Sequence, residues 1–384
     1  MRPAGSRNPE LEAAIADNPS EDAWQVYFDW LQSQGDPWGE RGNLALARDK
    51  AKGPAKAKLT KQLAEFDAAH GDALFGASLL ELMKNDDFTK VAEVSEQYGL
   101  FWTVRVRSPE YDWSGTAPST ALAELMKSPA ARLIQQINIG LMDHDPPDLQ
   151  KGVDVLWEAE SLPNLRSLFI GDFEYPDDTE ISWIEDGIDA TAMLKVAPRL
   201  RSLHIRGSGI QVGTLEHDTL ERLILETGGL PEDAVESVGS CRLPALTHME
   251  VWFGREGYGA GGNVEQLAGL LAGEGVPKLR HLGLKNGDWQ DDIASALVHS
   301  NVLAQLETVD LSMGTMHGNG VEAIIANPAK LSHLKRLDLS DNYLSNNQVE
   351  RVKAALGTIV EIGRQKKPYD RGGGDLRYYA SVGE

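Results

Sequence analysis

One eleven-residue segment, residues 334–344, constrains the fold more than any other part of the chain. It places apolar side chains at Leu334, Leu337, Leu339 and Leu344 and an amide at Asn342. This spacing is typical of a short strand that directs alternate leucines to one side and then turns. A single strand of this kind has no second layer against which to bury its leucines. The segment therefore predicts further copies of itself in the chain.

Eight other segments repeat the spacing of its first three leucines, which is apolar, two residues, apolar, one residue, apolar. Their first residues are Phe101, Ile134, Leu165, Leu200, Leu220, Leu246, Leu279 and Leu306. Successive copies start 33, 31, 35, 20, 26, 33, 27 and 28 residues apart, lengths that suit a strand followed by a returning helix. The shortest interval, after Ile205, is rich in glycine and leaves no room for a helix of normal length.

These segments resemble the leucine-rich-repeat family, in its longer-repeat, ribonuclease-inhibitor-like form, over residues 97–364. The resemblance implies an α/β fold, namely a curved leucine-rich-repeat solenoid with a parallel sheet on the concave side and helices on the convex side. Such a likeness specifies the fold and leaves the ligand open.

The segment before the repeats has its own helical signals. Ser20 is placed to cap a helix in which Trp24, Tyr27, Phe28 and Leu31 form one apolar stripe. Together with this stripe, three motifs resemble the repeat-companion domain at the start of many bacterial, especially myxobacterial, repeat proteins; they are Asn18-Pro19, Asp29-Trp30-Leu31 and Gly35-Asp36-Pro37. The resemblance implies a companion of a repeat array and no known chemistry.

We therefore expect three parts. Residues 1–96 form an N-terminal α-helical repeat-companion and capping domain, residues 97–364 form the solenoid, and residues 365–384 form a C-terminal capping tail. In the first part, a lysine-rich stretch opens a helix at Pro54. In the tail, residues 376–382 alternate like one more strand, and Tyr378 and Tyr379 favour docking of this strand.

The composition limits the possible partners. A formal net charge of -21 repels nucleic acid and acidic membrane surfaces, so we expect neither as a partner. The single cysteine, Cys241, excludes an internal disulfide and a cysteine-built zinc site. The chain also lacks an apolar run long enough to cross a membrane, so we expect a cytoplasmic protein. We also expect it to be a monomer on its own.

The solvent-facing positions of the strands gather an aromatic and basic cluster on this acidic chain. Strand side chains alternate between faces, so residues two, four and six positions after the first apolar residue line the concave sheet as three ladders. The predicted partner-binding residues are Phe169, His204, Arg206, Arg222, Ile224, His248, Trp252, His281 and Lys285. Aromatic and arginine side chains dominate interface energies, so this pattern favours protein binding.

Three more specific chemical hypotheses, a zinc site, a nucleotide site and a catalytic set, each have an argument against them. His248, Glu250 and His281 could hold a zinc ion, but an open sheet offers little outer-shell support, so we expect no metal. Residues 257–262 fit G-x-G-x-x-G, but the next strand is followed by Lys285 rather than an acid, so we expect no nucleotide or other cofactor. No catalytic set accompanies Cys241, and we expect no enzymatic activity.

The sequence therefore predicts a non-enzymatic scaffold that recognises another protein through the concave sheet and the loop at residues 254–262. An alternative is a regulated substrate or inhibitor, on which a partner protease or effector acts at a loop or at the tail, in a bacterial signalling or defence pathway.

Overall fold

The computed structural model describes residues 5–159, 161–184, 187–372 and 374–383, which form two compact units. The first unit comprises Met1–Asp145, Lys151–Leu168 and Lys195–Leu200, and the second comprises Pro146–Gln150, Phe169–Leu194 and Arg201–Glu384.

Helices occur along the whole chain. The α-helices are α1 (Pro9–Asp17), α2 (Glu21–Ser33), α3 (Pro37–Lys50), α4 (Gly53–Phe75), α5 (Ala77–Met83), α6 (Asp86–Val91), α7 (Pro118–Lys127), α8 (Gln150–Trp157), α9 (Met193–Val196), α10 (Glu232–Gly239), α11 (Ala268–Ala272), α12 (Gln290–Val298), α13 (Asn319–Ala326), α14 (Pro328–Leu331) and α15 (Asn346–Leu356). The 3-10 helices are η1 (Pro129–Leu133), η2 (Ile181–Trp183), η3 (Glu256–Tyr258), η4 (Val264–Leu267), η5 (Val302–Gln305) and η6 (Gly357–Ile359).

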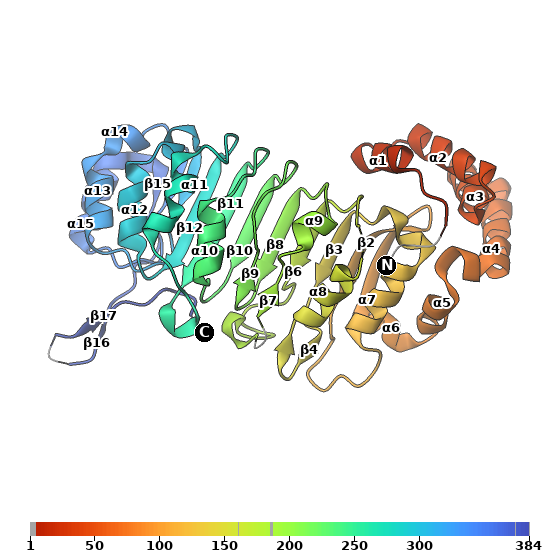
Figure 1. Ribbon diagram of the computed structural model, residues 1–384, viewed down its shortest axis with the longest axis horizontal. Helices are drawn as coiled ribbons and strands as arrows, with labels where there is room; N and C mark the ends of the chain where they lie inside the picture. The colour runs from red at the N-terminus through yellow and green to blue at the C-terminus, as the bar shows by residue number, and fades with distance from the viewer. Residues whose placement is uncertain (1–4, 160, 185–186, 373, 384) are drawn as a thin grey trace. The chain divides into compact units, whose positions relative to one another are not determined.

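Most strands belong to one large, mostly parallel sheet (Figure 1). The strands of this sheet are, in order, β1 (Ala92–Gln97), β2 (Leu100–Val106), β3 (Gln136–Ile139), β6 (Ser167–Ile170), β8 (Ser202–Arg206), β10 (Arg222–Glu226), β11 (His248–Gly254), β12 (His281–Gly287), β13 (Thr308–Asp310), β14 (Arg336–Asp338) and β15 (Val360–Glu361). The remaining strands are β4 (Asp143–His144), β5 (Pro147–Asp148), β7 (Ile188–Asp189), β9 (Ile210–Gln211), β16 (Tyr369–Asp370) and β17 (Leu376–Arg377).

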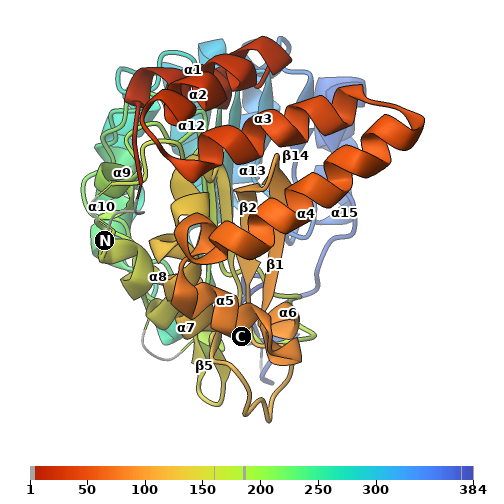
Figure 2. The same cartoon turned by 90° about the vertical axis from the view of Figure 1, so that its right-hand side faces the viewer.

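The N-terminal helices of the first unit form where the sequence predicts them. Ser20 caps α2 by accepting a hydrogen bond from the Ala23 amide at 3.3 Å, and the apolar stripe of α2 is buried. Helix α3 packs beside α2, and Gly42 allows the close approach, because a Cβ there would lie 2.2 Å from the Phe28 ring. Figure 2 shows α3 and α4 side by side.

The Gly-Asp-Pro motif has a structural role in this unit. Asp36 caps α3 through the amide of Trp38 at 3.0 Å, and Pro37 is the first residue of that helix. The other Asp36 oxygen accepts a hydrogen bond from Arg132 Nη1 at 3.0 Å, and both side chains are buried. A buried carboxylate is stable only when it is paired in this way. The aspartate therefore connects α3 to the first repeats.

The end of the helical segment differs from the prediction. Residues Ala92–Gln97 form β1, which pairs antiparallel with β2, so the predicted boundary at residue 96 lies within a hairpin. Tyr98 and Gly99 make the tight turn with φ of 50° and 85°. Two residues at positive φ are the geometry that a two-residue hairpin turn requires.

The second unit carries the regular repeats. Strands β8 and β10–β15 are parallel neighbours, and Figure 1 shows helices α10, α12, α13 and α15 against one face of them. The leucine triplets fill the core between sheet and helices; Leu223, Leu284 and Leu337 are each at most 1% exposed. The short repeat after Ile205 contains only the two-residue strand β9 before β10, which confirms the predicted missing helix.

The asparagine of the repeat motif joins neighbouring repeats. Asn342 is fully buried, and its Nδ2 donates to the carbonyls of Leu311 at 2.8 Å and Leu339 at 3.2 Å. Its Oδ1 accepts from the amide of Met316 at 3.1 Å. The side chain thus satisfies backbone groups that the turn leaves without partners.

The C-terminal tail forms a shorter strand than the predicted residues 376–382. Its strand β17 pairs antiparallel with β16, and the residues after it turn back onto the repeats. Val382 is 4% exposed, donates from its amide to Asn286 Oδ1 at 2.8 Å and accepts from Asn286 Nδ2 at 2.7 Å. The tail therefore docks, as the two tyrosines suggested, but on the end of β12.

Among the described residues, no helix combines the length and the apolar composition that are needed to cross a lipid bilayer.

Candidate functional site

The strand register of the second unit aligns the predicted ladder residues. Arg222 pairs with Ser202 and His248, His248 pairs with His281, and His281 pairs with Thr308. The second ladder is aligned in the same way, because Ile224 pairs with both His204 and Glu250. In the third ladder, Arg206 pairs with Glu226. We call the surface formed by these three ladders, on the sheet side opposite the leucine core, the ladder face.

Phe169, His204 and Arg206 form the first group on the ladder face. The rings of Phe169 and His204 stack with centroids 4.0 Å apart and planes within 5° of parallel. Arg206 lies with its guanidinium carbon 5.6 Å from the Phe169 centroid, and its Nη1 donates to the Phe173 carbonyl at 2.8 Å. Stacking on a ring and a hydrogen bond to a backbone carbonyl fix the orientation of the guanidinium.

An acidic residue that sequence reasoning missed completes this group. Glu226 Oε2 accepts from Arg206 Nε at 2.5 Å, and its Oε1 lies 3.3 Å from His204 Nε2. Burial would raise the pKa of Glu226, but the neighbouring His204 and Arg206 outweigh burial and lower the pKa below its usual value. Glu226 therefore stays ionised and holds both basic side chains in place.

Trp252 and Lys285 form the second group, again with acidic partners. Lys285 Nζ lies 5.3 Å from the Trp252 ring centroid, 3.2 Å from Glu250 Oε1 and 3.1 Å from Asp310 Oδ2. Trp252 Nε1 donates to Glu250 at 2.8 Å. Burial lowers the pKa of Lys285, but the two carboxylates overcome this effect and raise it. The tryptophan is half-buried, where the sequence predicted an exposed ring.

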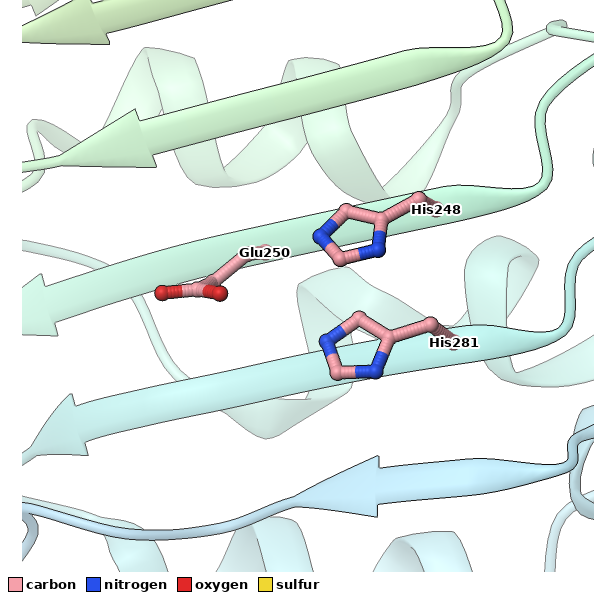
Figure 3. A group of neighbouring side chains, drawn as sticks. All are labelled: His248, Glu250 and His281. Carbon is pink, nitrogen blue, oxygen red and sulfur yellow. The ribbon is translucent and has the colours of Figure 1, made fainter.

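His248 and His281 begin the two strands that carry Trp252 and Lys285, and they form a stacked pair. Their ring centroids are 4.1 Å apart with planes 13° from parallel, and Figure 3 shows the Glu250 carboxylate beside them. Burial, followed by the charges of His281 and Arg222, lowers the pKa of His248 to about 3. Burial also lowers the pKa of His281. Both rings are therefore neutral at pH 7.

Two of the predicted binding residues differ strongly in exposure. Arg222 is exposed at the start of β10. Ile224 is only 4% exposed, so the expectation that it offers an apolar surface to a partner is wrong for this structure. His204 and Glu250 are its register neighbours on the two adjacent strands.

The ladder face is therefore not the basic patch that the sequence suggested. Its cations Arg206, Arg222 and Lys285 are accompanied by the carboxylates Glu226, Glu250 and Asp310. These acids occupy ladder positions too, so the alignment of the triplets already contained the signal for them. The group as a whole is nearly charge-balanced, rigid and rich in rings.

The 254–262 loop lies next to the docked tail. The Arg255 guanidinium carbon is 4.2 Å from the ring centroid of Tyr379 and 5.7 Å from that of Tyr258. The loop leads into the 3-10 helix η4, which Asn263 caps and which continues directly into α11.

Cys241 lies away from the ladder face, at the end of α10. Its thiol is buried, and burial raises its pKa to about 12. A thiol that stays protonated at neutral pH is a poor nucleophile.

The register, the leucine core and the recurring strands define an α/β repeat protein whose mostly parallel sheet fits a leucine-rich-repeat-like fold. No family model matches the chain, and no curated protein is similar to it in sequence.

Two solved structures align with this chain. The crystal structure of a Bacteroides fragilis protein from a structural genomics consortium aligns with a TM-score of 0.61 and 23% identity, over 84% of this chain and 87% of that one. The two proteins therefore share a fold. The crystal structure of a TLR13–ssRNA13 complex aligns with a TM-score of only 0.32 and 13% identity, over 70% of this chain and 37% of that one.

Proposed function

We propose that this chain is a non-enzymatic scaffold that binds another protein through the ladder face and the adjoining 254–262 loop. The observation that carries the proposal is the set of oriented rings and cations on the ladder face, namely Phe169, His204, Arg206, Trp252 and Lys285. Aromatic and arginine side chains contribute most of the energy in measured protein interfaces.

Preorganisation supports this proposal. Glu226 holds Arg206, and Glu250 holds both Trp252 and Lys285, so these side chains lose little rotamer freedom when a partner arrives. Ordering a long side chain at an interface otherwise costs ~0.5–1.5 kcal/mol. The arrangement therefore leaves more of the contact energy for affinity.

The size of the surface also fits. Phe169 to Lys285 spans five neighbouring strands, which at ~4.8 Å spacing cover roughly 20 Å of the sheet. The 254–262 loop extends this area toward the ~800 Å² per partner of a standard interface. Because the charges are balanced, we expect a partner surface with matching hydrogen-bond groups rather than a strongly acidic one.

The test begins with affinity capture from extracts of the producing organism, followed by titration with the partner so identified. Trp252→Ala should weaken binding by about 2 kcal/mol, which is roughly 30-fold. The control is Trp183→Ala, because Trp183 is 61% exposed and lies outside the ladder face. Equal affinities for both variants, or unchanged capture by a Trp252→Ala/Arg222→Ala double variant, would remove the ladder face as the binding site.

A further inference from the structure

His248, Glu250 and His281 converge on one point of the ladder face. Each offers one ligand atom, an imidazole nitrogen or a carboxylate oxygen, and these atoms lie within 4.8 Å of one another. Figure 3 shows one nitrogen of each ring directed to the side on which the Glu250 carboxylate lies. Two imidazoles and one carboxylate are the ligand set of many zinc sites that keep one position open.

The two histidines each have a nitrogen without a partner. The Nε2 atoms of His248 and His281 are both buried from solvent, and neither has a hydrogen-bond partner among the described residues. A buried polar atom without a partner is costly, and in native proteins it usually marks a water or an ion. Two such atoms on adjacent stacked rings point to a shared ligand.

The site also has the outer-shell support that an open sheet was expected to lack. His281 Nδ1 lies 2.7 Å from Thr308 Oγ1, on the next strand. When Nδ1 donates to this hydroxyl, Nε2 carries the free lone pair that a metal needs. Hydrogen bonds of this kind fix the ring and the tautomer of metal-binding histidines.

Two features oppose the site and limit its strength. Trp252 Nε1 and Lys285 Nζ both contact Glu250 Oε1, so a metal would bind through Oε2 with a cation nearby. Tetrahedral zinc, with bonds of ~2.0–2.1 Å, also holds its ligand atoms roughly 3.3 Å apart. The three ligand atoms therefore have to approach one another by up to about 1.5 Å. The stacked rings also hold their Nε2 lone pairs nearly parallel, so both rings have to tilt toward the ion, and metal binding rearranges the His248–His281 stack. Asp310 also contacts Lys285 and therefore neutralises part of the positive charge of the lysine.

We propose that His248, His281 and Glu250 bind one divalent transition-metal ion of the zinc class, with a fourth position open to water or to a partner's side chain. Imidazole and carboxylate ligands suit Zn²⁺ and Co²⁺ better than they suit Mg²⁺, which prefers oxygen ligands alone. This inference goes beyond the scaffold proposal.

The experiment titrates the purified, chelator-treated full-length protein with Zn²⁺ by calorimetry and with Co²⁺ by visible absorption, and uses Mg²⁺ as the negative probe. We expect one site that binds Zn²⁺ more tightly than Mg²⁺ and a Co²⁺ spectrum of tetrahedral type. His248→Ala and His281→Ala should each weaken binding at least tenfold and abolish the Co²⁺ spectrum. Thr308→Val, which leaves all three ligands in place, should weaken binding about tenfold.

The matched control is His299→Ala, because His299 is exposed on a different element, at the end of α12, and should bind no metal there. Circular dichroism confirms that each variant is folded. Unchanged Zn²⁺ affinity in His281→Ala, or a Zn²⁺ affinity no greater than that for Mg²⁺ in the wild type, would overturn the proposal. The measurement needs no partner protein, so its failure is separate from failure of the scaffold proposal.

Discussion

Replacing Glu226 with glutamine tests whether the acid holds the ladder face in order. The change keeps the shape of the side chain and removes its charge. Arg206 and His204 then lose the carboxylate that they contact at 2.5 Å and 3.3 Å. Arg206 retains its Phe173 carbonyl and its ring contacts, but it becomes a partly buried cation without an anion.

The magnitude follows from burial. The side chains of Glu226 and Arg206 are 12% and 22% exposed, so the pair lies between a surface and a buried ion pair. Exposed pairs contribute ~0.2–1 kcal/mol, and breaking a buried pair costs ~3–5 kcal/mol. We therefore expect Glu226→Gln to lower the free energy of unfolding by about 2 kcal/mol at pH 7.

The pH dependence has a definite sign. The pKa of Glu226 in the folded state is lower than in the unfolded chain, where it is about 4.3. Its stabilisation is therefore complete above the unfolded pKa and is lost as the pH falls through the folded pKa. The difference between wild type and Glu226→Gln should be full at pH 7 and should shrink below about pH 4.

Urea denaturation followed by circular dichroism, in a series from pH 7 to pH 3.5, measures this difference. The control is Glu221→Gln, one residue before β10. Its side chain is 52% exposed and lies 3.9 Å from Arg201, so the change should cost no more than about 0.5 kcal/mol. If Glu226→Gln is no more destabilising than this control, or if its deficit is as large at pH 3.5 as at pH 7, the reasoning is refuted.

Two further predictions concern the repeats and the tail. Asn342→Leu removes three hydrogen bonds to buried backbone groups, so the free energy of unfolding in urea should fall by about 3 kcal/mol; a midpoint equal to that of the exposed-site variant Asn347→Ala would contradict this role. In Asn286→Gly, the glycine adopts the φ of 56° at this position without strain, but both hydrogen bonds to the backbone of Val382 are lost. Hydrogen exchange should then lose protection at Val382 alone, and retained protection there would show that other contacts dock the tail.

The arrangement of the repeats could be predicted from the sequence because each leucine triplet is a local pattern. Leu223, Met249 and Leu282 must face the core, so the residues beside them must share the other face. The stacking of His248 on His281 and the pairing of Trp252 with Lys285 follow from this register. The half-buried state of Trp252 does not, because it depends on how neighbouring side chains, such as Lys285 on β12, settle against the ring.

The features that the sequence did not reveal arise from the packing of side chains and from contacts distant in sequence. Ile224 was expected to be exposed because alternation along a strand assigns a face but not the degree of burial on that face. The docking of Val382 on Asn286 joins residues 96 apart, and no local pattern predicts such a contact. The hairpin turn at Tyr98 likewise depends on β2 being available as a partner.

By itself, the sequence determined which residues form strands, which side of each strand enters the core and which side chains share a ladder. These properties follow from a period of two along each strand and from the repeat interval, both of which are written in the order of the residues. Only the tertiary structure decided how the ladder residues are paired, charged and covered. Those properties depend on distances between side chains of different strands, such as Glu226 to Arg206 and Thr308 to His281, which exist only once the strands are side by side.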